Sequence, residues 1–395
     1  MICAATVTAQ AQTDGAGKAP KAKVKKWTSM APKLKDSFFK TAEATRIGDN
    51  VLLYQQTTGG WPKNVNMQLP LEGEALSKVK AAKDDVNEST IDNKATTTEI
   101  TYLCRLYNAT GEERFRQGAL RGMEYLFEAQ YDNGGWPQFY PRPKGYYTHI
   151  TYNDDAMVNV LKVMRDVAKG KEPYAFMPDS TKAKAQAALD KGVECIVKTQ
   201  VVQDGSPTVW CAQYDEHTLQ PAPARAYELV SLSGQESDDI VLFLMSLSNP
   251  SAEVVRCVES AVAWFRKSEI HGLTFEFYKD GNGQRDYRMV PCADDSDCPP
   301  LWARFYTIDT NRPFFSDRDG VVRYDIAEIG HERRTGYSWY NSDGLDVYKR
   351  YKTWAEKHGS TPVAANLRYI IMCGPRLPPA HKCRRYRRGP HVYAP

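Results

Sequence analysis

Apolar residues recur every three or four positions along most of the chain, the pattern of helices that bury one face. These runs predict helices over Met30–Ala44, Thr98–Tyr107, Glu112–Ala129, Asp155–Ala168, Ser180–Lys198, Asp238–Leu247, Ala252–Phe265 and Leu345–Lys357. Gly and Pro residues lie between the runs, where helices must end. From about Gly272 to Gly330 apolar and polar residues alternate instead, as in LTFEFY and VVRYDI. That stretch predicts short strands and long loops.

A recurring phrase links the predicted helices. VLLYQQTTGGWPKN returns as YLFEAQYDNGGWPQF and, in a weaker form, as CIVKTQVVQDGSPTVWCAQYD. The tryptophans of the three copies, Trp61, Trp136 and Trp210, are almost evenly spaced, which predicts a repeat of about two helices. Because Trp61 and Trp136 follow equivalent Gly-Gly turns, we expect both to be structural. The expected fold is mainly α, an (α/α) toroid-like helical repeat domain with a short β-strand and loop region.

Composition and charge exclude some classes of protein. The 395 residues are 42% hydrophobic, enough to bury a full core. The net charge of +4 is carried by the ends, since residues 376–388 hold six Lys and Arg and residues 1–27 hold five Lys, so the remainder is acidic. A nucleic-acid-binding domain would place its basic stripe on folded elements. We therefore expect no nucleic-acid partner. No apolar run approaches the length of a membrane span.

These features predict three segments. Residues 1–34 are expected to be a signal remnant or disordered linker, residues 35–373 a folded domain, and residues 374–395 a basic disordered tail. The first segment contains ICAATVTAQAQ, whose small residues resemble the end of a secretion signal, so we expect a secreted or periplasmic protein. Cys292 and Cys298 could close a loop in such an oxidising compartment. We expect a monomer.

Polar residues gather in two loops that each precede a helix. One contains Asp92 and Asn93, and the other is Asn153-Asp154-Asp155. A single Asn or Asp is enough to cap a helix, so the run of three is either a solvated acidic cap or a functional site. Loops at the same end of a helical toroid converge on its axis, which could bring Asp92 and Asp154 together. Two carboxylates with amide oxygens and waters would suit Ca²⁺.

Three arginines lie among prolines and aromatic residues. Arg225, Arg304 and Arg312 are in PARAYE, LWARFY and NRPFF. A guanidinium held in such rigid surroundings is suited to a bidentate grip on a carboxylate. The alternative for each is a structural arginine paired with a local acid, which we favour slightly for Arg304. Acid loops, rigid arginines and exposed aromatics together indicate a protein that binds an anionic sugar through a metal ion. A P-loop, a dinucleotide glycine motif and a Ser-His-Asp order are absent from the sequence.

Several blocks carry a resemblance to a known family. GGWPKN, IDNKATTTEI, EAQYDNGGWPQFYP, ITYNDDAM, PARAYE, PPLWARFYTIDTNRPFFSDRDG and ERRTGYSWY resemble the pectate lyases of polysaccharide lyase family 10. The blocks follow the family order over roughly Lys35 to Lys357. The resemblance implies a mostly helical toroid-like fold and a catalytic domain at residues 35–373. It also implies cleavage of polygalacturonate by calcium-dependent β-elimination, which gives 4,5-unsaturated oligogalacturonides.

The resemblance also implies roles for individual residues. Asp154 would be a calcium ligand together with Asp155, and Asp92 would be a second carboxylate of the metal and substrate site, beside Asn93. Arg312 would hold the substrate carboxylate, with Arg304 as a further contact.

The sequence offers two candidates for the catalytic base. The resemblance implies that Arg225 would match the catalytic arginine of the family, but a guanidine normally stays protonated. The base is therefore either Arg225, deprotonated near the metal at alkaline pH, or another group. Lys63 in GGWPKN is the second candidate because lysine shifts its pKa more readily, although it could equally be a surface lysine.

Two other functions stay open. One is an inverting glycoside hydrolase that uses Asp92 and Asp154 as acid and base. The other is an inert pectin-binding protein.

Overall fold

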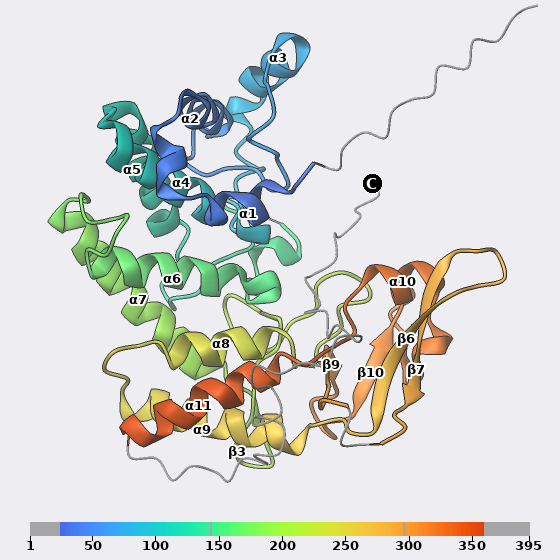
Figure 1. Cartoon of the computed structure of the whole chain (residues 1–395). Coiled ribbons are helices and arrows are strands. Elements are labelled where there is room, and N and C mark those ends of the chain that lie inside the picture. Colours follow the sequence, from blue (N-terminus) through green and yellow to red (C-terminus); the bar gives the residue numbers. More distant parts are fainter. Residues whose placement is uncertain (1–23, 143, 295–297, 359–395) are drawn as a thin grey trace, which may run out of the picture.

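The computed structural model describes residues 24–142, 144–294 and 298–358. Most of this chain forms helix pairs. The helices are α1 (Trp27–Met30), α2 (Ala42–Tyr54), α3 (Gly73–Ala81), α4 (Thr97–Thr110), α5 (Glu113–Glu128), α6 (Ala156–Ala168), α7 (Asp179–Thr199), α8 (Glu236–Leu244), α9 (Ala252–Lys267), α10 (His331–Gly336) and α11 (Gly344–His358). Helix α4 packs on α5, α6 on α7, and α8 on α9, while α11 packs on both α8 and α9. Figure 1 shows this stack running from α2 and α5 at one end to α9 and α11 at the other.

The pairs are arranged in two rows. Helices α4, α6 and α8 contact one another in sequence, and so do α5, α7 and α9. Two helices of the first row, α4 and α6, begin directly after the loops in which the sequence predicts a site. The mainly α, toroid-like stack with a short β region confirms the predicted fold class.

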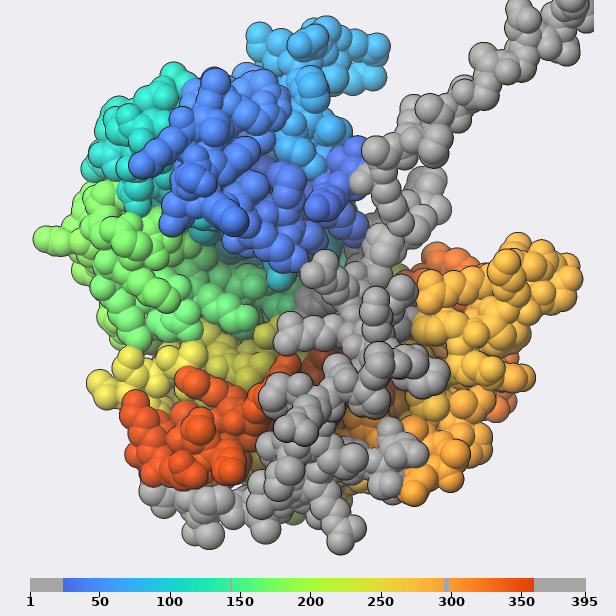
Figure 2. All heavy atoms as spheres, in the orientation of Figure 1, coloured from blue at the N-terminus to red at the C-terminus, as the bar shows by residue number. Residues whose placement is uncertain are grey.

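The strands form small antiparallel sheets beside the stack. A four-stranded sheet has the order β11 (Val322–Arg323), β10 (Pro313–Ser316), β9 (Phe305–Tyr306) and β5 (Leu232–Ser233). Two-stranded sheets pair β6 (Leu273–Lys279) with β7 (Arg285–Pro291), β8 (Trp302–Ala303) with β12 (Tyr340–Asn341), β1 (Ile150–Thr151) with β4 (Gln213–Tyr214), and β2 (Val202–Gln203) with β3 (Ser206–Pro207). Figures 1 and 2 show β6, β7 and β10 gathered to one side of the helices. The predicted strand region is thus confirmed, with LTFEFY as the start of its longest hairpin.

The predicted N-terminal elements are partly wrong. In place of one helix over Met30–Ala44, the chain forms α1 and two 3₁₀ turns, η1 (Ala31–Lys33) and η2 (Asp36–Lys40). Extended backbone at Leu34 and Lys35 separates the two turns. Helix α2 then begins after Thr41, whose hydroxyl accepts a hydrogen bond from the Ala44 N–H at 3.2 Å.

Folded structure also begins before Lys35, the predicted start of the domain. Trp27 is buried, and its indole N–H donates to Glu99 Oε1 at 2.7 Å. Residues 24–34 are therefore part of the fold and not of a linker. Helix α3 was not predicted. It buries none of its residues and stands out from the surface in Figure 2, so it lacks the apolar face by which a helix is recognised in sequence.

The repeated phrase has a repeated structure. In each copy the Gln after the helix donates from Nε2 to a carbonyl of its own turn and to a carbonyl of the neighbouring hairpin. The acceptors are Gly59 and Gly118 for Gln55, Gly134 and Ala188 for Gln130, and Thr208 and Cys257 for Gln200. These bonds attach each helix pair to the next.

The repeat tryptophans are buried in the structure, as expected for the structural role predicted for Trp61 and Trp136. Trp61, Trp136 and Trp210 are buried, and their indole N–H groups donate to carbonyls of the preceding helix. Trp302 is a fourth member that the sequence analysis missed. It is also buried, and its N–H donates to the Phe265 carbonyl on α9. A long insertion containing β6 and β7 separates Trp302 from α9, which hides the repeat spacing.

The structure also contains the disulfide that the sequence allows. Cys292 and Cys298 form a disulfide after β7. Four other cysteines of the described residues, Cys104, Cys195, Cys211 and Cys257, are buried free thiols.

None of the described helices is long and apolar enough to cross a membrane. The predicted tail at 374–395 lies outside the described residues.

Candidate active site

Two short loops at the starts of α4 and α6 have the same backbone shape. They form the 3₁₀ turns η4 (Asp92–Lys94) and η6 (Asn153–Asp155), which contact each other. Asn93 and Asp154 occupy equivalent left-handed conformations, with φ of 51° and 52°. The next residues, Lys94 and Asp155, also have positive φ. Non-glycine residues adopt this region at a cost, and such strain is concentrated at functional sites.

Asp92 is the buried carboxylate at the centre of the first loop. It is 1% exposed, and its Oδ2 accepts hydrogen bonds from Lys63 Nζ at 2.6 Å and Gln138 Nε2 at 3.0 Å. Burial raises the pKa of Asp92 above its ordinary value and the Asp154 charge adds to the rise, whereas Lys63 opposes it. The predicted convergence of Asp92 and Asp154 is therefore observed. Lys63 is also placed in the site, with its side chain 25% exposed.

The second loop does not serve as a helix cap. Asp155 occupies the N-cap position of α6, but its side chain makes no capping hydrogen bond. Asp154 and Asp155 are both buried, and Asn153 Nδ2 donates to Asp154 Oδ2 at 3.2 Å. A solvated acidic cap would be exposed, so the structure favours the functional interpretation of this tripeptide.

Arg304 lies beneath the second loop as a buried cation. Its guanidinium donates to Asn153 Oδ1 at 3.1 Å, to Glu236 Oε1 at 3.0 Å and to Gln235 Oε1 at 2.8 Å. Burial alone would lower the pKa of Arg304, but Glu236 and other nearby acidic groups raise it above its ordinary value. Because Arg304 is only 2% exposed and bonds to Asn153, its contacts hold the second loop in place. The substrate contact of Arg304 stays a prediction, beside the structural alternative.

Arg225 is connected to this buried cation through two side chains. Arg225 Nε donates to Glu228 Oε2 at 2.8 Å and Nη2 to Glu228 Oε1 at 2.5 Å. The Tyr337 hydroxyl also donates to Glu228 Oε1, and the Arg304 guanidinium lies 4.2 Å from the centre of the Tyr337 ring. Although burial by itself lowers the pKa of Arg225, the hydrogen bond and charge of Glu228 raise it. The ion pair with Glu228 therefore favours the protonated guanidinium, and 27% of the Arg225 side chain is exposed.

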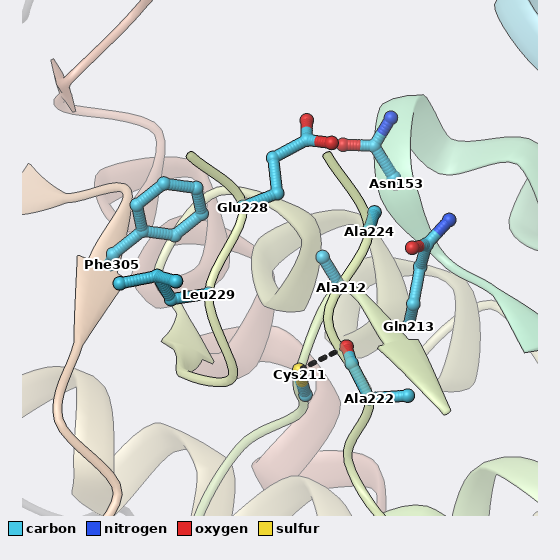
Figure 3. Close-up of a pocket in the computed structure, with 9 residues that line it drawn as sticks. All are labelled: Asn153, Cys211, Ala212, Gln213, Ala222, Ala224, Glu228, Leu229 and Phe305. Atoms are coloured by element: carbon cyan, nitrogen blue, oxygen red, sulfur yellow. Dashed lines mark hydrogen bonds between the residues drawn. The ribbon is translucent and has the colours of Figure 1, made fainter. Parts of the chain in front are cut away.

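A small cavity separates the Arg225 turn from the second loop. Figure 3 shows the side chains of Glu228 and Asn153 directed toward each other on one side and those of Leu229 and Phe305 on the other. Its volume is about 10 Å³, which is room for about one water molecule and not for a sugar.

The other predicted substrate residues have different surroundings. Asn93 is half-buried, and its Nδ2 donates to Asn64 Oδ1 at 3.3 Å. Arg312 is exposed on the β region, where its guanidinium stacks 3.5 Å from the centre of the Tyr324 ring. Among the described residues Arg312 forms no ion pair, so a ligand carboxylate could bind it without displacing a protein acid. The described contacts of Arg312 are with Tyr324 and Thr307, both in the β region.

The oxygen donors of the two loops fit a hard divalent cation. Asp92 and Asp154 are close enough for each charge to affect the other, and a cation near both would relieve that repulsion. The described residues contain one set of three side chains whose ligand atoms lie within 4.8 Å of one another, and it is His149, Asp215 and Glu216. The predicted ligands Asp92, Asp154 and Asp155 are less tightly gathered than this set.

Sequence reasoning missed the residues that support the site. Gln138, Gln235, Glu236, Glu228 and Tyr337 were not singled out. A signal for Gln138 was present, because it follows Trp136 by two positions just as Lys63 follows Trp61. Arg304 follows Trp302 in the same way. The repeat therefore brings the second residue after each of these tryptophans to the acid loops.

Comparisons with known proteins agree with this geometry. The family model of pectic acid lyase matches residues 55–348. The family 10 polysaccharide lyase of Cellvibrio cellulosa has 36% sequence identity and a TM-score of 0.69, and the match covers 84% of this chain and 95% of that chain. A mutant of that lyase in complex with trigalacturonic acid matches with the same identity and TM-score, over 96% of its chain. No curated protein sequence matches. The chain therefore belongs to the pectic acid lyase family and is a polysaccharide lyase.

Proposed function

We propose that this enzyme is a calcium-dependent pectate lyase that cleaves α-1,4-linked polygalacturonate by β-elimination. The observation that carries the proposal is the meeting of Asp92 and Asp154 at the ends of two repeat loops, with a network of side chains leading from them to Arg225. The complex of a family relative with trigalacturonic acid supports an oligogalacturonide substrate.

The elimination needs a base and a means to hold negative charge. The base removes the C5 proton of a galacturonate, the electrons of the C5–H bond form the C4–C5 double bond, and the C4–O bond breaks to release the preceding chain. The C5 proton is acidic only if the charge that develops on the adjacent carboxylate is stabilised. We propose that Arg312 holds that carboxylate by a bidentate contact.

Asp92, Asp154 and Asp155 are the proposed calcium ligands, with Asn93 beside them toward the substrate. When bound, calcium would supply positive charge that stabilises the carboxylate of the reacting sugar. The protein contributes the position of the ligands: Lys63 and Gln138 fix Asp92, and Arg304 fixes Asn153 next to Asp154.

We propose Arg225 as the base and keep Lys63 as the second candidate. Glu228 raises the pKa of Arg225, so the neutral guanidine is favoured only at alkaline pH. Lys63 is bonded to Asp92 and would have to leave that contact, or lose a proton to the solvent, before it could accept one. The rate should therefore rise with pH for either base.

The reaction type is tested by the products formed from polygalacturonate. β-Elimination creates a conjugated unsaturated uronide that absorbs in the ultraviolet, whereas hydrolysis by Asp92 and Asp154 creates no double bond. We expect ultraviolet absorbance to rise in step with the number of new reducing ends. New reducing ends without absorbance would identify a glycoside hydrolase, and binding without cleavage at any pH would identify an inert pectin-binding protein.

Calcium dependence is tested by chelation and by a matched pair of variants. We expect a chelator to abolish activity and calcium to restore it, and Asp154→Ala to lose the calcium-restored activity. Asp215→Ala is the control, because it alters the other set of potential ligands. Full activity after chelation would remove the metal from the mechanism, and loss of activity in Asp215→Ala alone would move the metal to that set.

We also propose that the enzyme is secreted or periplasmic and acts as a monomer. The disulfide between Cys292 and Cys298 supports an oxidising compartment. Fractionation of producing cells tests the location. Light scattering of the purified protein tests the monomeric state.

A further inference from the structure

A second cavity lies between α4, α6 and the turn η1, separate from the Glu228 cavity. Its volume is about 230 Å³, which is smaller than the typical site for a drug-sized ligand but much larger than a water molecule. Lys94, the residue after Asn93, forms one edge of the cavity. The cavity is therefore adjacent to the first acid loop without including its carboxylate.

Hydrogen-bonding groups line two walls of this cavity. Thr97, Thr98 and Thr101 follow one face of α4, and Asn159 faces them from α6. The Nδ2 atom of Asn159 is buried and has no hydrogen-bond partner among the described residues. A buried amide donor without a partner costs free energy, so a small rotation of the Asn159 side chain that brings this donor to an acceptor in the cavity is favoured.

The charged residues of the lining are all basic. Lys94, Arg105 and Lys162 contribute to the walls, and none of the described lining residues is acidic. Arg105 pairs with the exposed Asp36 at 2.7 Å, and Lys162 lies 3.5 Å from Asp239. These acids approach from outside the lining, so the cavity itself presents cations and polar side chains to its contents. Such a lining suits an anion and would repel a metal ion.

The remaining wall is apolar. Pro32, Tyr102 and Val163 face the cavity. A phosphate or sulfate ion would gain nothing from these groups, whereas the ring of a sugar packs on apolar and aromatic surfaces and uses its hydroxyls for hydrogen bonds. The combined lining fits a single polyhydroxylated ring that carries one carboxylate.

We propose that this cavity is a binding site for a single uronate residue, with its carboxylate near Asn159 and Lys162. The choice of a uronate over other carboxylates rests on the proposed function. The residue is either a free monouronate or the end of an oligogalacturonide. Both present the same chemistry, so the experiment compares them.

The experiment measures binding of galacturonate and of trigalacturonate by calorimetry, with chelator present so that no turnover occurs. Galacturonate has no glycosidic bond, so its binding does not depend on lyase activity. Asn159→Asp replaces the donor with an acid, and Lys162→Met removes one cation. Lys169→Met is the matched control, since Lys169 follows the last residue of α6 and bonds to Ser248 outside the cavity.

We expect wild-type protein to bind galacturonate and Asn159→Asp to weaken binding by about tenfold or more. Lys162→Met should weaken it by a smaller factor, and Lys169→Met should leave it unchanged. Circular dichroism confirms that each variant is folded. If the protein binds trigalacturonate more tightly than galacturonate, and Asn159→Asp weakens both to the same degree, the ligand is a chain end. If the two ligands bind with equal affinity, the ligand is the monouronate.

Three outcomes would overturn the inference. The first is no galacturonate binding to the wild-type protein. The second is unchanged binding in folded Asn159→Asp. The third is binding that is lost in Arg312→Ala but kept in Asn159→Asp, which would place galacturonate in the catalytic cleft. Ultraviolet product assays on the same samples report separately on the proposed lyase function.

Discussion

Arg304 and Arg225 are two arginines of one network with opposite surroundings. Arg304 is almost fully buried and bonds to side chains that precede α6 and α8. Arg225 is partly exposed, and its ion pair is with Glu228, three residues along the same turn. Both pKa values are raised, and both arginines carry their charge at neutral pH.

The difference indicates which arginine can act on a ligand. A cation held by several elements is costly to move, so we expect Arg304 to position Asn153 and the acid loop. A cation held by its own turn can exchange its partner or its proton while the fold persists. Substitutions in the two arginines should therefore separate loss of catalysis from loss of stability.

The largest effect is expected for Arg225→Lys. The variant keeps a cation but changes its reach and pKa, so turnover should fall by about 10²–10⁴-fold, the usual contribution of a general acid or base. Calcium-dependent binding of oligogalacturonate should largely survive. Steady-state kinetics on polygalacturonate and calorimetry with trigalacturonate measure the two effects.

Lys63→Ala is the companion experiment. If Arg225→Lys keeps near-normal turnover while folded Lys63→Ala is inactive, the base is Lys63 and the elimination mechanism stands. Lys63→Ala also removes the partner of Asp92. Its calcium affinity must therefore be measured, so that loss of the base is distinguished from loss of the metal.

Arg304→Met should lower stability. The variant leaves Glu236 buried without its cation, and removal of one partner of a buried pair costs about 3–5 kcal/mol of stability. Denaturant unfolding measures this loss. Arg318→Met is the control, because Arg318 and its partner Glu332 are both exposed and contribute little. Equal stability of both variants would show that Arg304 does not hold the loops.

The same contrast explains what the sequence could predict. The helices, the repeat and the convergence of Asp92 with Asp154 follow from periodicity, because a repeat places equivalent loops at the same end of the stack. The base network could not be derived in this way. Glu228 and Tyr337 are far apart in sequence and meet through irregular segments and short strands. The prediction of a single helix over Met30–Ala44 was wrong for a local reason. The backbone becomes extended at Leu34 and interrupts an otherwise helical pattern.

Arg312→Lys tests an arginine outside the network. The variant replaces a planar, two-pronged donor with a point charge, so it loses the bidentate hold on a carboxylate. Because this contact is needed in the ground state and more so in the transition state, we expect KM to rise and kcat to fall, each by about tenfold or less. Separate measurement of the two constants on polygalacturonate is the test. A variant with wild-type constants would exclude Arg312 from substrate binding.

The smallest and most specific effect is expected for Glu228→Gln. Glu228 raises the pKa of Arg225, and a base is active only when it has lost its proton, so the rate should increase as pH rises toward that pKa. Glutamine keeps a hydrogen-bond acceptor for Arg225 and Tyr337 but removes the negative charge. The pKa of Arg225 should fall, and the alkaline rise in kcat should move to lower pH. Glu332→Gln, which removes an acid paired with Arg333, should leave the profile unchanged. If the profile of Glu228→Gln does not move while that of a Lys63 variant does, proton abstraction belongs to Lys63, and Arg225 serves to bind the substrate.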